Sequence, residues 1–363
     1  AEVLEALLCA GAVQAGPGEF TRRAFLSGKL SLSQAEAVIQ VIEAESREKL
    51  RVETAQAKGV LSAKVDLLYD RIRALVSSTY AYIDFPDEDM TDVSTAQMLS
   101  ALHEISEELH QLHATYRTGR AICEGIPTAI VGRPNTGKSS LLNCLLGEAR
   151  AIVTPIAGTT RDTIEETATV GRVLLRLCDT AGIHETDDAV ERIGVERSLE
   201  KMQQADLILA VFDGSELPTE EDRSLLRQIT SVKRGTAIAI LNKNDLGVAW
   251  KESCGNIFDR TVSLSCETGD GISALADAIN ELYVDGALDY ENTPILTSAR
   301  QSSAVALAEE CISRAIASLE AGMTQDIAGM DLEEALTHLG ELDGRRVTEE
   351  IVDDIFHRFC VGK

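Results

Sequence analysis

The clearest chemical signal in the chain is a segment from Gly132 to Ser139 that reads G-R-P-N-T-G-K-S. Its spacing matches the phosphate-binding pattern G-x-x-x-x-G-K-[ST], between a strand pattern and a helical one. The glycines let backbone N–H groups turn toward phosphate oxygens, and the helix N-terminus favours negative charge. Lys138 would bridge the β- and γ-phosphates, and the Ser139 hydroxyl would bind Mg²⁺. The other residues assigned to this phosphate loop are Asn135, Thr136, Gly137 and Ser140.

A second polar segment, N-K-N-D at residues 242–245, indicates which base would be bound. A carboxylate at Asp245 can accept hydrogen bonds from both the ring N–H and the exocyclic amine of guanine, a donor pair that adenine lacks. Such tetrapeptides are common in loops, but this one follows a phosphate loop in the right order. A later loop, residues 265–267, would close over the base through a backbone N–H. The residues assigned to the base are Asn242, Lys243, Asp245, Ser265, Cys266 and Glu267.

Two intervening loops would respond to the γ-phosphate. Asp179 follows an apolar run and would reach Mg²⁺ through water, while Gly182 would sense the γ-phosphate. Thr160 would bind Mg²⁺ when GTP orders its loop. The order of these elements along the chain predicts a guanine-nucleotide switch. The residues assigned to these loops are Thr154, Pro155, Ile156, Ala157, Gly158, Thr159 and Thr160 in the first, and Asp179, Thr180, Ala181 and Gly182 in the second.

Short apolar runs would position these loops. Each run is followed by a loop or helix signal, and the alternation predicts a Ras-like α/β domain with a mostly parallel sheet and crossover helices. The runs are Thr128–Val131, Leu174–Leu177, Leu207–Phe212, Ala237–Leu241 and Val262–Leu264.

Helical patterns flank this block on both sides. Apolar residues recur at intervals of three and four from Ser33 to about Tyr82, which allows two long helices, and again from about Ser94 to Tyr116. The same spacing returns after about Thr293. This arrangement predicts an all-α helical-bundle domain interrupted by the α/β block.

Two clusters of polar residues in the helical regions are candidate metal sites. The acidic cluster after Ile83 suits a helix break with capping carboxylates, and a cation site is the alternative. His103, His110 and His113 share a helix and could bind a metal, although exposed helix histidines are more usual.

Composition sets further limits. The 363 residues suggest two or three domains, and 59 acidic against 34 basic residues give a net charge of −25. Nucleic acid would therefore require a local basic patch or a basic partner. Eight cysteines without a C-x-x-C pair fit free thiols in a reducing, cytoplasmic compartment. No apolar run is long enough to predict a membrane span, and the missing initial Met suggests a fragment.

The whole chain resembles the MnmE (also called TrmE) family of tRNA-modification GTPases. Besides the motifs above, the resemblance rests on P-G-E-F-T-R-R-A-F-L at residues 17–26, I-D-F-P at 83–86 and F-C-V-G-K at 359–363. It implies a remnant of an N-terminal α+β folate-binding and dimerisation domain in residues 1–27, with the rest of that domain absent. It also implies a helical domain in residues 28–122 and 287–363, and a GTPase domain in residues 123–286.

The resemblance adds roles that the motifs do not supply. Such GTPases are activated by K⁺ and by dimerisation of their GTPase domains, the cation neutralising charge where others use an arginine finger. Glu191 matches the catalytic glutamate, which would orient the attacking water; a solvated helix carboxylate is the alternative. His184 stands where the family commonly has arginine, and Cys266 replaces the usual alanine. The residues matching the K⁺ shell are Asn135, Thr154, Ile156 and Thr159.

The modification chemistry is also implied by resemblance. A homodimer would work with the FAD-dependent MnmG (GidA) on tRNA, adding a carboxymethylaminomethyl or aminomethyl group at C5 of the wobble uridine. A 5-formyl- or methylene-tetrahydrofolate would carry the one-carbon unit. Lys29 and Lys363 match the folate pocket, and Cys360 matches a terminal cysteine assigned to the chemistry. An ordinary free thiol and a solvated terminus are the alternatives for Cys360 and Lys363.

Two other functions share the switch motifs. A ribosome-assembly GTPase would carry a basic RNA-binding appendage, whereas the segment after the α/β block is acidic and helical. A GTP-gated scaffold with negligible hydrolysis would not require Glu191, Asn135 and Thr160 together.

Overall fold

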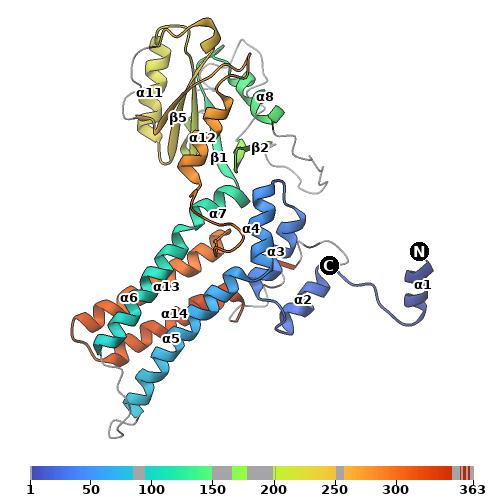
Figure 1. Ribbon diagram of the computed structural model, residues 1–363, viewed down its shortest axis with the longest axis vertical. Coiled ribbons are helices and arrows are strands. Elements are labelled where there is room, and N and C mark those ends of the chain that lie inside the picture. Colours follow the sequence, from blue (N-terminus) through green and yellow to red (C-terminus); the bar gives the residue numbers. More distant parts are fainter. Residues whose placement is uncertain are drawn as a thin grey trace. The chain divides into compact units, whose positions relative to one another are not determined.

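The computed structural model describes residues 2–84, 95–148, 166–177, 199–200, 202–250, 257–345, 352, 355–356 and 359. The chain divides into two compact units (Figure 1). One unit combines Ala1–Gly119 with Asp289–Lys363, and the other is Arg120–Leu288. Because the first unit is built from two separate segments, the second is an insertion into it.

The inserted unit is built around a six-stranded sheet with the order β2-β3-β1-β4-β5-β6. All neighbouring pairs are parallel except β2 and β3, so the predicted mostly parallel sheet is confirmed. β2 was not predicted, because it is an edge strand whose short sequence E-T-A-T-V mixes exposed and buried positions. The strands are β1 Ile126–Val131, β2 Glu166–Val170, β3 Val173–Leu177, β4 Leu207–Asp213, β5 Thr236–Asn242 and β6 Arg260–Ser263.

Helices cover both faces of this sheet. The helices are α8 Lys138–Glu148, α11 Glu220–Val232 and α12 Ile272–Tyr283. Alternate residues of the fully buried β4 face opposite sides. Leu209 belongs to a core shared with α8 and α12, whereas Phe212 belongs to a core shared with α11. A sheet buried on both faces explains why its strands are continuous apolar runs.

The other unit is helical. Its helices are α1 Glu2–Cys9, α2 Glu19–Leu26, α3 Leu32–Ile42, α4 Arg47–Ala57, α5 Val60–Asp84, α6 Thr95–Ala114, α13 Ala299–Glu320 and α14 Gln325–Asp343. A further helix, α7 Tyr116–Cys123, crosses from this unit into the inserted one. None of the helices in the described part of the chain is long and apolar enough to cross a membrane.

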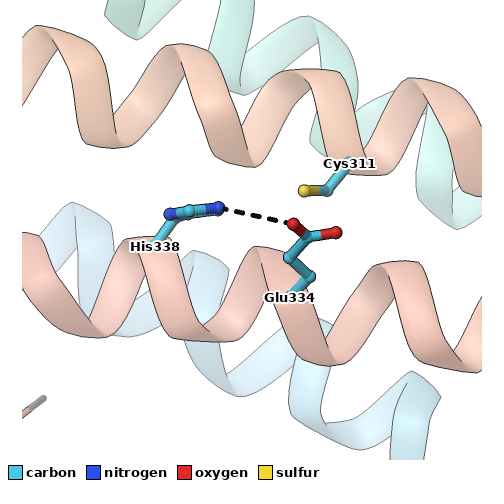
Figure 2. A group of neighbouring side chains, drawn as sticks. All are labelled: Cys311, Glu334 and His338. Carbon is cyan, nitrogen blue, oxygen red and sulfur yellow. Dashed lines mark ion pairs between the residues drawn. The ribbon is translucent and has the colours of Figure 1, made fainter.

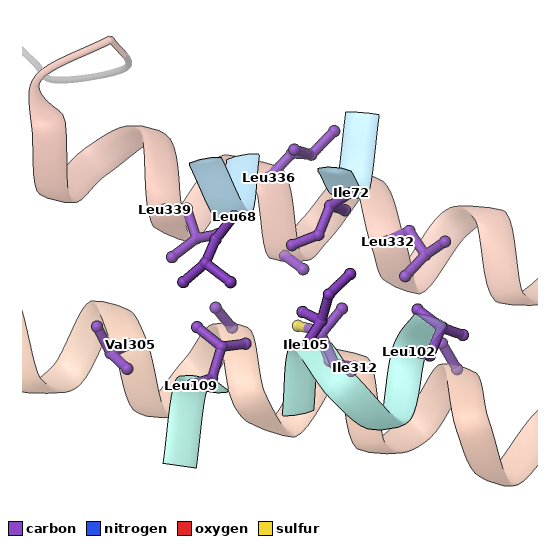
Figure 3. Close-up of a cluster of buried hydrophobic side chains, with 14 of the residues drawn as sticks. Leu68, Ile72, Leu102, Ile105, Leu109, Val305, Ile312, Leu332, Leu336 and Leu339 are labelled. Atoms are coloured by element: carbon purple, nitrogen blue, oxygen red, sulfur yellow. The ribbon is translucent and has the colours of Figure 1, made fainter. Parts of the chain in front are cut away.

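The core of the helical unit lies between α5, α6, α13 and α14 (Figure 3). Each helix contributes aliphatic side chains at intervals of three and four, such as Leu102, Ile105 and Leu109 on α6. α13 packs against both α14 and α6, while α14 packs against α5. This packing confirms the predicted helical bundle.

The prediction of two long helices between Ser33 and Tyr82 was wrong, because the stretch forms α3, α4 and α5. The first helix, α3, ends at Ile42, and Ser46 begins α4 as its N-cap, where its hydroxyl oxygen accepts a hydrogen bond from the Lys49 N–H (3.1 Å). Gly59, with φ +89°, separates α4 from α5. Both residues are ordinary helix boundary signals, and apolar periodicity alone does not register them.

The two segments of the helical unit meet where the insertion leaves and returns. A Cβ atom on Gly119 would lie 2.0 Å from the carbonyl oxygen of Leu296, so only glycine fits there. The Leu296 N–H donates to the Thr115 hydroxyl oxygen (3.1 Å). We call Thr115, Gly119 and Leu296 the clasp. It holds the end of the first segment against the start of the second.

The three histidines of α6 face two glutamates of α13. His103 lies 3.7 Å from Glu320, while His110 and His113 lie 3.0 and 3.8 Å from Glu309. No group of three metal-ligating side chains in the described ranges includes these histidines. Their contacts therefore tie α6 to α13.

The helical unit contains a buried carboxyl group, Asp343, at the end of α14. Burial and the neighbouring Asp66 carboxylate raise the pKa of Asp343 from its ordinary 3.8 to about 6, and Arg345 offsets this in part. The folded state therefore disfavours the ionised form. As the pH rises from about 4 to above 6, this group makes the fold less stable.

We expect Asp343→Asn to remove this penalty. At pH 7.5 the variant should be more stable than the parent chain by about 3 kcal/mol, with little difference at pH 4. Thermal unfolding followed by circular dichroism at both pH values checks this. Asp70→Asn, at an exposed acid on α5, is the control and should show no such pH-dependent gain. A gain for Asp343→Asn that is equal at both pH values would contradict the assignment.

Candidate functional site

The phosphate loop connects β1 to α8 at the carboxyl edge of the sheet. Two of its residues have positive φ, Asn135 (+62°) and Gly137 (+95°). A Cβ atom on Gly132 would lie 2.4 Å from the carbonyl oxygen of Val211 on β4, and one on Gly137 would lie 2.1 Å from Asn242 Nδ2. Both motif glycines are thus required by close packing, which leaves the loop backbone in the shape that a phosphate cradle needs.

Lys138 and Thr136 fold back on the loop. The Lys138 ammonium donates to the Arg133 carbonyl oxygen (2.8 Å), and the fully buried Thr136 donates its hydroxyl to the same oxygen (3.0 Å). Burial lowers the pKa of Lys138. A poorly hydrated ammonium is stabilised by anionic oxygens, so this position suits a phosphate. Ser139 and Ser140 follow in the first turn of α8, at the end of the helix where its dipole favours an anion.

Asn242 links the phosphate loop to the loop predicted to close over the base. It lies at the end of β5 and is almost fully buried. Its Nδ2 donates to the Thr136 carbonyl oxygen (2.9 Å), and its Oδ1 accepts from the Cys266 N–H (3.1 Å). One side chain therefore fixes the spacing of the two loops.

Lys243 pairs with an acid that the sequence analysis missed. Its ammonium donates to Asp213 Oδ2 at the end of β4 (2.6 Å), and Ser215 donates to Asp213 from both its N–H (3.0 Å) and its hydroxyl (2.6 Å). Burial alone would raise the pKa of Asp213, but these hydrogen bonds outweigh it and lower the pKa. A carboxylate directly after a buried parallel strand was the available signal.

The base-recognition residues lie on two short turns. Asp245 is exposed in the 3₁₀ turn η1, Asn244–Leu246. Ser265 is buried, and its hydroxyl oxygen accepts from the backbone N–H groups of Glu267 and Thr268 (both 3.3 Å). These bonds shape the turn that contains Cys266.

Cys266 packs against a second thiol, Cys144 of α8, which the sequence analysis also missed. Cys144 Sγ donates to the Cys266 carbonyl oxygen (3.4 Å). Burial and the neighbouring Cys144 raise the pKa of Cys266 to about 12. Cys266 therefore stays protonated near neutral pH and acts as a packing residue.

Arg133 ties the phosphate loop to the start of α11, although it occupies a variable position of the motif. It lies 2.7 Å from Glu216 and 3.4 Å from the buried Asp222. Asp222 in turn caps α11 by accepting from the Thr219 N–H (2.9 Å). These contacts of Arg133 fix the phosphate loop to the N-terminal end of α11.

The structure brings three of the predicted groups together at the carboxyl edge of β1, β5 and β6: the phosphate loop, residues 242–245 and residues 265–267. Lys29 lies in the helical unit, on a cavity of about 610 Å³ that Arg22, Ser31 and Arg345 also line. The predicted site residues outside the described residues are Thr154, Pro155, Ile156, Ala157, Gly158, Thr159, Thr160, Asp179, Thr180, Ala181, Gly182, Glu191, Cys360 and Lys363, together with His184.

Comparison with known proteins identifies the family. The family model of the MnmE helical domain matches residues 32–360. The protein named tRNA modification GTPase MnmE from Heliobacterium modesticaldum is 42% identical over 373 residues, covering 100% of this chain and 79% of the relative. Its namesake from Syntrophus aciditrophicus is 42% identical over 367 residues, covering 99% and 79%.

Among solved structures, the chain is similar to Aquifex aeolicus Era bound to GDP and aluminium fluoride. The identity is 28%, the TM-score is 0.33, and the match covers 51% of this chain and 65% of that one. The family assignment rests on the two kinds of match above, which extend over nearly all of the chain. The chain belongs to the MnmE family of tRNA modification GTPases.

Proposed function

We propose that this GTPase hydrolyses GTP at the carboxyl edge of its sheet in order to serve the modification of the wobble uridine of tRNA. The observation that carries the proposal is the double bridge made by Asn242, which holds the Thr136 carbonyl and the Cys266 N–H at a fixed spacing. A bound nucleotide spans the same two loops, with its phosphates on one and its base on the other. Family membership supports tRNA as the macromolecular substrate.

The phosphate loop provides most of the binding in this proposal. Lys138 would contact the β- and γ-phosphates, and the Ser139 hydroxyl would hold Mg²⁺ together with Thr160. Mg²⁺ and K⁺, when bound, supply positive charge beside the phosphates. Asn135, held at positive φ by the loop, offers its side-chain oxygen to K⁺. The residues proposed to complete the K⁺ shell are Thr154, Ile156 and Thr159.

The finer assignments are part of the same proposal. A homodimer pairs its GTPase domains across the nucleotide in a K⁺-dependent manner, and Glu191 orients the attacking water. The FAD-dependent MnmG (GidA) is the partner in the modification. The net charge of −25 supports a division of labour in which tRNA is held by local basic patches or by the partner.

A tetrahydrofolate that carries the one-carbon unit is proposed to bind through Lys29 and Lys363, with residues 1–27 assigned to the folate-binding domain. The cavity beside Lys29 supports this, because its volume of about 610 Å³ leaves room for a ligand and both Lys29 and Arg22 line it. The carboxylates of Asp66 and Asp343 also line the cavity, and Arg345 pairs with Asp66. Cys360 is proposed to act in the modification chemistry.

The test is steady-state GTP hydrolysis with Mg²⁺, in KCl and in NaCl at equal ionic strength. We expect a rate at least about tenfold higher in KCl, because a cation at the phosphates substitutes for an arginine finger. Equal rates in the two salts would reject the cation-assisted mechanism. Absence of turnover in both salts would favour a GTP-gated scaffold.

Glu191→Ala is expected to reduce turnover by about 10²-fold while nucleotide affinity stays within about twofold, since general acid–base or water-orienting groups act only on the chemical step. Single-turnover hydrolysis and titration with a fluorescent GDP separate these effects. Glu221→Ala, at an exposed glutamate of α11, is the matched control. Unchanged turnover in the Glu191 variant would remove this residue from the mechanism.

A further inference from the structure

Three side chains that commonly ligate metals converge between α13 and α14 in the helical unit (Figure 2). Cys311 comes from α13, while Glu334 and His338 come from α14, one turn apart. One ligand atom from each, the thiol sulfur, a carboxylate oxygen and a ring nitrogen, lie within 4.8 Å of one another. We propose that this cluster binds a transition-metal ion of the zinc type through one thiolate, one carboxylate and one imidazole.

The imidazole of His338 is oriented for this role. Its Nε2 lies 4.0 Å from Glu334 Oε1 and faces the cluster, while its Nδ1 lies 3.8 Å from Glu341 Oε2. Nδ1 is buried and makes no hydrogen bond. A metal-bound histidine usually donates its second ring N–H to a carboxylate, which fixes the tautomer and the ring orientation. Glu341 is placed to be that carboxylate.

The separation of the ligand atoms is close to that of a tetrahedral site. Bonds of about 2.0–2.3 Å to zinc place neighbouring ligand atoms about 3.3–3.8 Å apart. The cluster must therefore contract by about 1 Å. Glu334 is the most exposed of the three residues, so its side chain can make this adjustment by a rotamer change without moving a helix. A water molecule would complete the coordination.

The surrounding charge also favours a cation. Three further carboxylates, those of Glu310, Asp331 and Glu341, lie near the cluster, and the guanidinium of Arg314 contacts two of its members. Arg314 donates to Cys311 Sγ (3.3 Å), Glu334 and Asp331 (2.8 Å) and lies 3.8 Å from Glu310. The guanidinium of Arg314 thus competes with the metal ion for two of the proposed ligands, Cys311 and Glu334. When the metal binds, Arg314 must give up its hydrogen bonds to Cys311 and Glu334, but it can retain its contacts with Asp331 and Glu310.

The thiol decides which metals suit the site. Burial raises the pKa of Cys311 to about 11, so the metal–sulfur bond forms as the thiol proton is released to solvent. Thiolate and imidazole are borderline-soft ligands, which select Zn²⁺ or Co²⁺ and disfavour Mg²⁺. The proposed ion therefore differs in class from the one expected at the phosphate loop.

The experiment is a titration of the whole chain with Co²⁺ in excess Mg²⁺, followed by Zn²⁺. We expect a cobalt–thiolate charge-transfer band that saturates at one equivalent and disappears as Zn²⁺ replaces Co²⁺. Cys311→Ala should abolish the band, and His338→Gln should weaken Co²⁺ binding at least about tenfold. Cys9→Ala, at an exposed cysteine, is the control and should retain the band. A band that survives Cys311→Ala, or no band in the parent chain, would overturn the proposal.

A variant that is expected to bind the metal more tightly tests the site independently, because misfolding can explain a loss of binding but not a gain. Arg314→Gln removes the competing cation and should tighten Co²⁺ binding by about tenfold, because a divalent ion a few ångströms from a unit charge is repelled even in water. Zn²⁺ should also raise the Tm of the parent chain by about 5 °C at a hundredfold excess over Kd, but not that of Cys311→Ala. Weaker binding in Arg314→Gln would show that Arg314 is not a competitor and would count against the site.

Discussion

Replacement of Gly137 by alanine is expected to weaken nucleotide binding by about 10³-fold. The added Cβ would lie 2.1 Å from Asn242 Nδ2, at a position where φ is +95°. Non-glycine residues pay about 1–2 kcal/mol for such a backbone. Asn242 must also move, which breaks its bonds to the Thr136 carbonyl and the Cys266 N–H and leaves buried polar groups unpaired at about 1–3 kcal/mol. A total of about 4 kcal/mol corresponds to this factor.

Titration with a fluorescent GDP analogue measures the effect, and α8, the helix that follows the loop, supplies the control. Gly147 lies near the end of α8, and a Cβ there would meet nothing within 4 Å. Gly147→Ala should leave affinity unchanged and stabilise the unit by about 0.5–1 kcal/mol. Affinity that is preserved in Gly137→Ala would mean that the Asn242 bridge does not set the spacing of the two loops.

Asp245→Asn is expected to exchange guanine for xanthine specificity, with a loss of about 10⁴-fold in affinity for GTP. The carboxylate accepts from two guanine donors, whereas an amide presents its own donor to one of them and leaves a buried polar group unpaired. The turn itself should survive, because it is held by backbone bonds, Leu246 N–H to the Lys243 carbonyl (3.0 Å) and Asn244 N–H to the Leu264 carbonyl (3.2 Å).

Competition of GTP, XTP and ATP against a fluorescent nucleotide tests this exchange. Asn244→Ala changes a neighbour in the same 3₁₀ turn, at the variable position of the motif, and should bind GTP as the parent chain does. If Asp245→Asn and the parent chain preferred the same base, Asp245 would not be the residue that reads it.

The central strands could be predicted from sequence because burial on both faces makes them continuous apolar runs, as in β4 and β5. The phosphate loop could be predicted because its residue types are dictated by backbone geometry at Gly132 and Gly137. β2 could not, because an edge strand shows only a short alternation. Helix boundaries at Ser46 and Gly59 were missed because a cap and a left-handed glycine are not part of an apolar periodicity.

Contacts between distant segments explain the remaining misses. Asp213 acquires its role only when β5 brings Lys243 beside it. The cluster of Cys311, Glu334 and His338 depends on which faces α13 and α14 turn toward each other, and the spacing of these residues along the chain matches no metal motif. The roles of such residues are set by packing, which local sequence patterns do not encode.

The clasp has a consequence for synthesis on the ribosome. α5 and α6 emerge before the inserted unit, but their partners α13 and α14 emerge only after it. The apolar faces that α5 and α6 later bury against α13 and α14 therefore stay exposed to solvent while the α/β unit is synthesised and folds as a separate domain. Because Thr115, Gly119 and Leu296 bring the two ends of the insertion together, a prefolded insert shortens the effective loop that the late helices must close, and so lowers the entropy cost of completing the bundle.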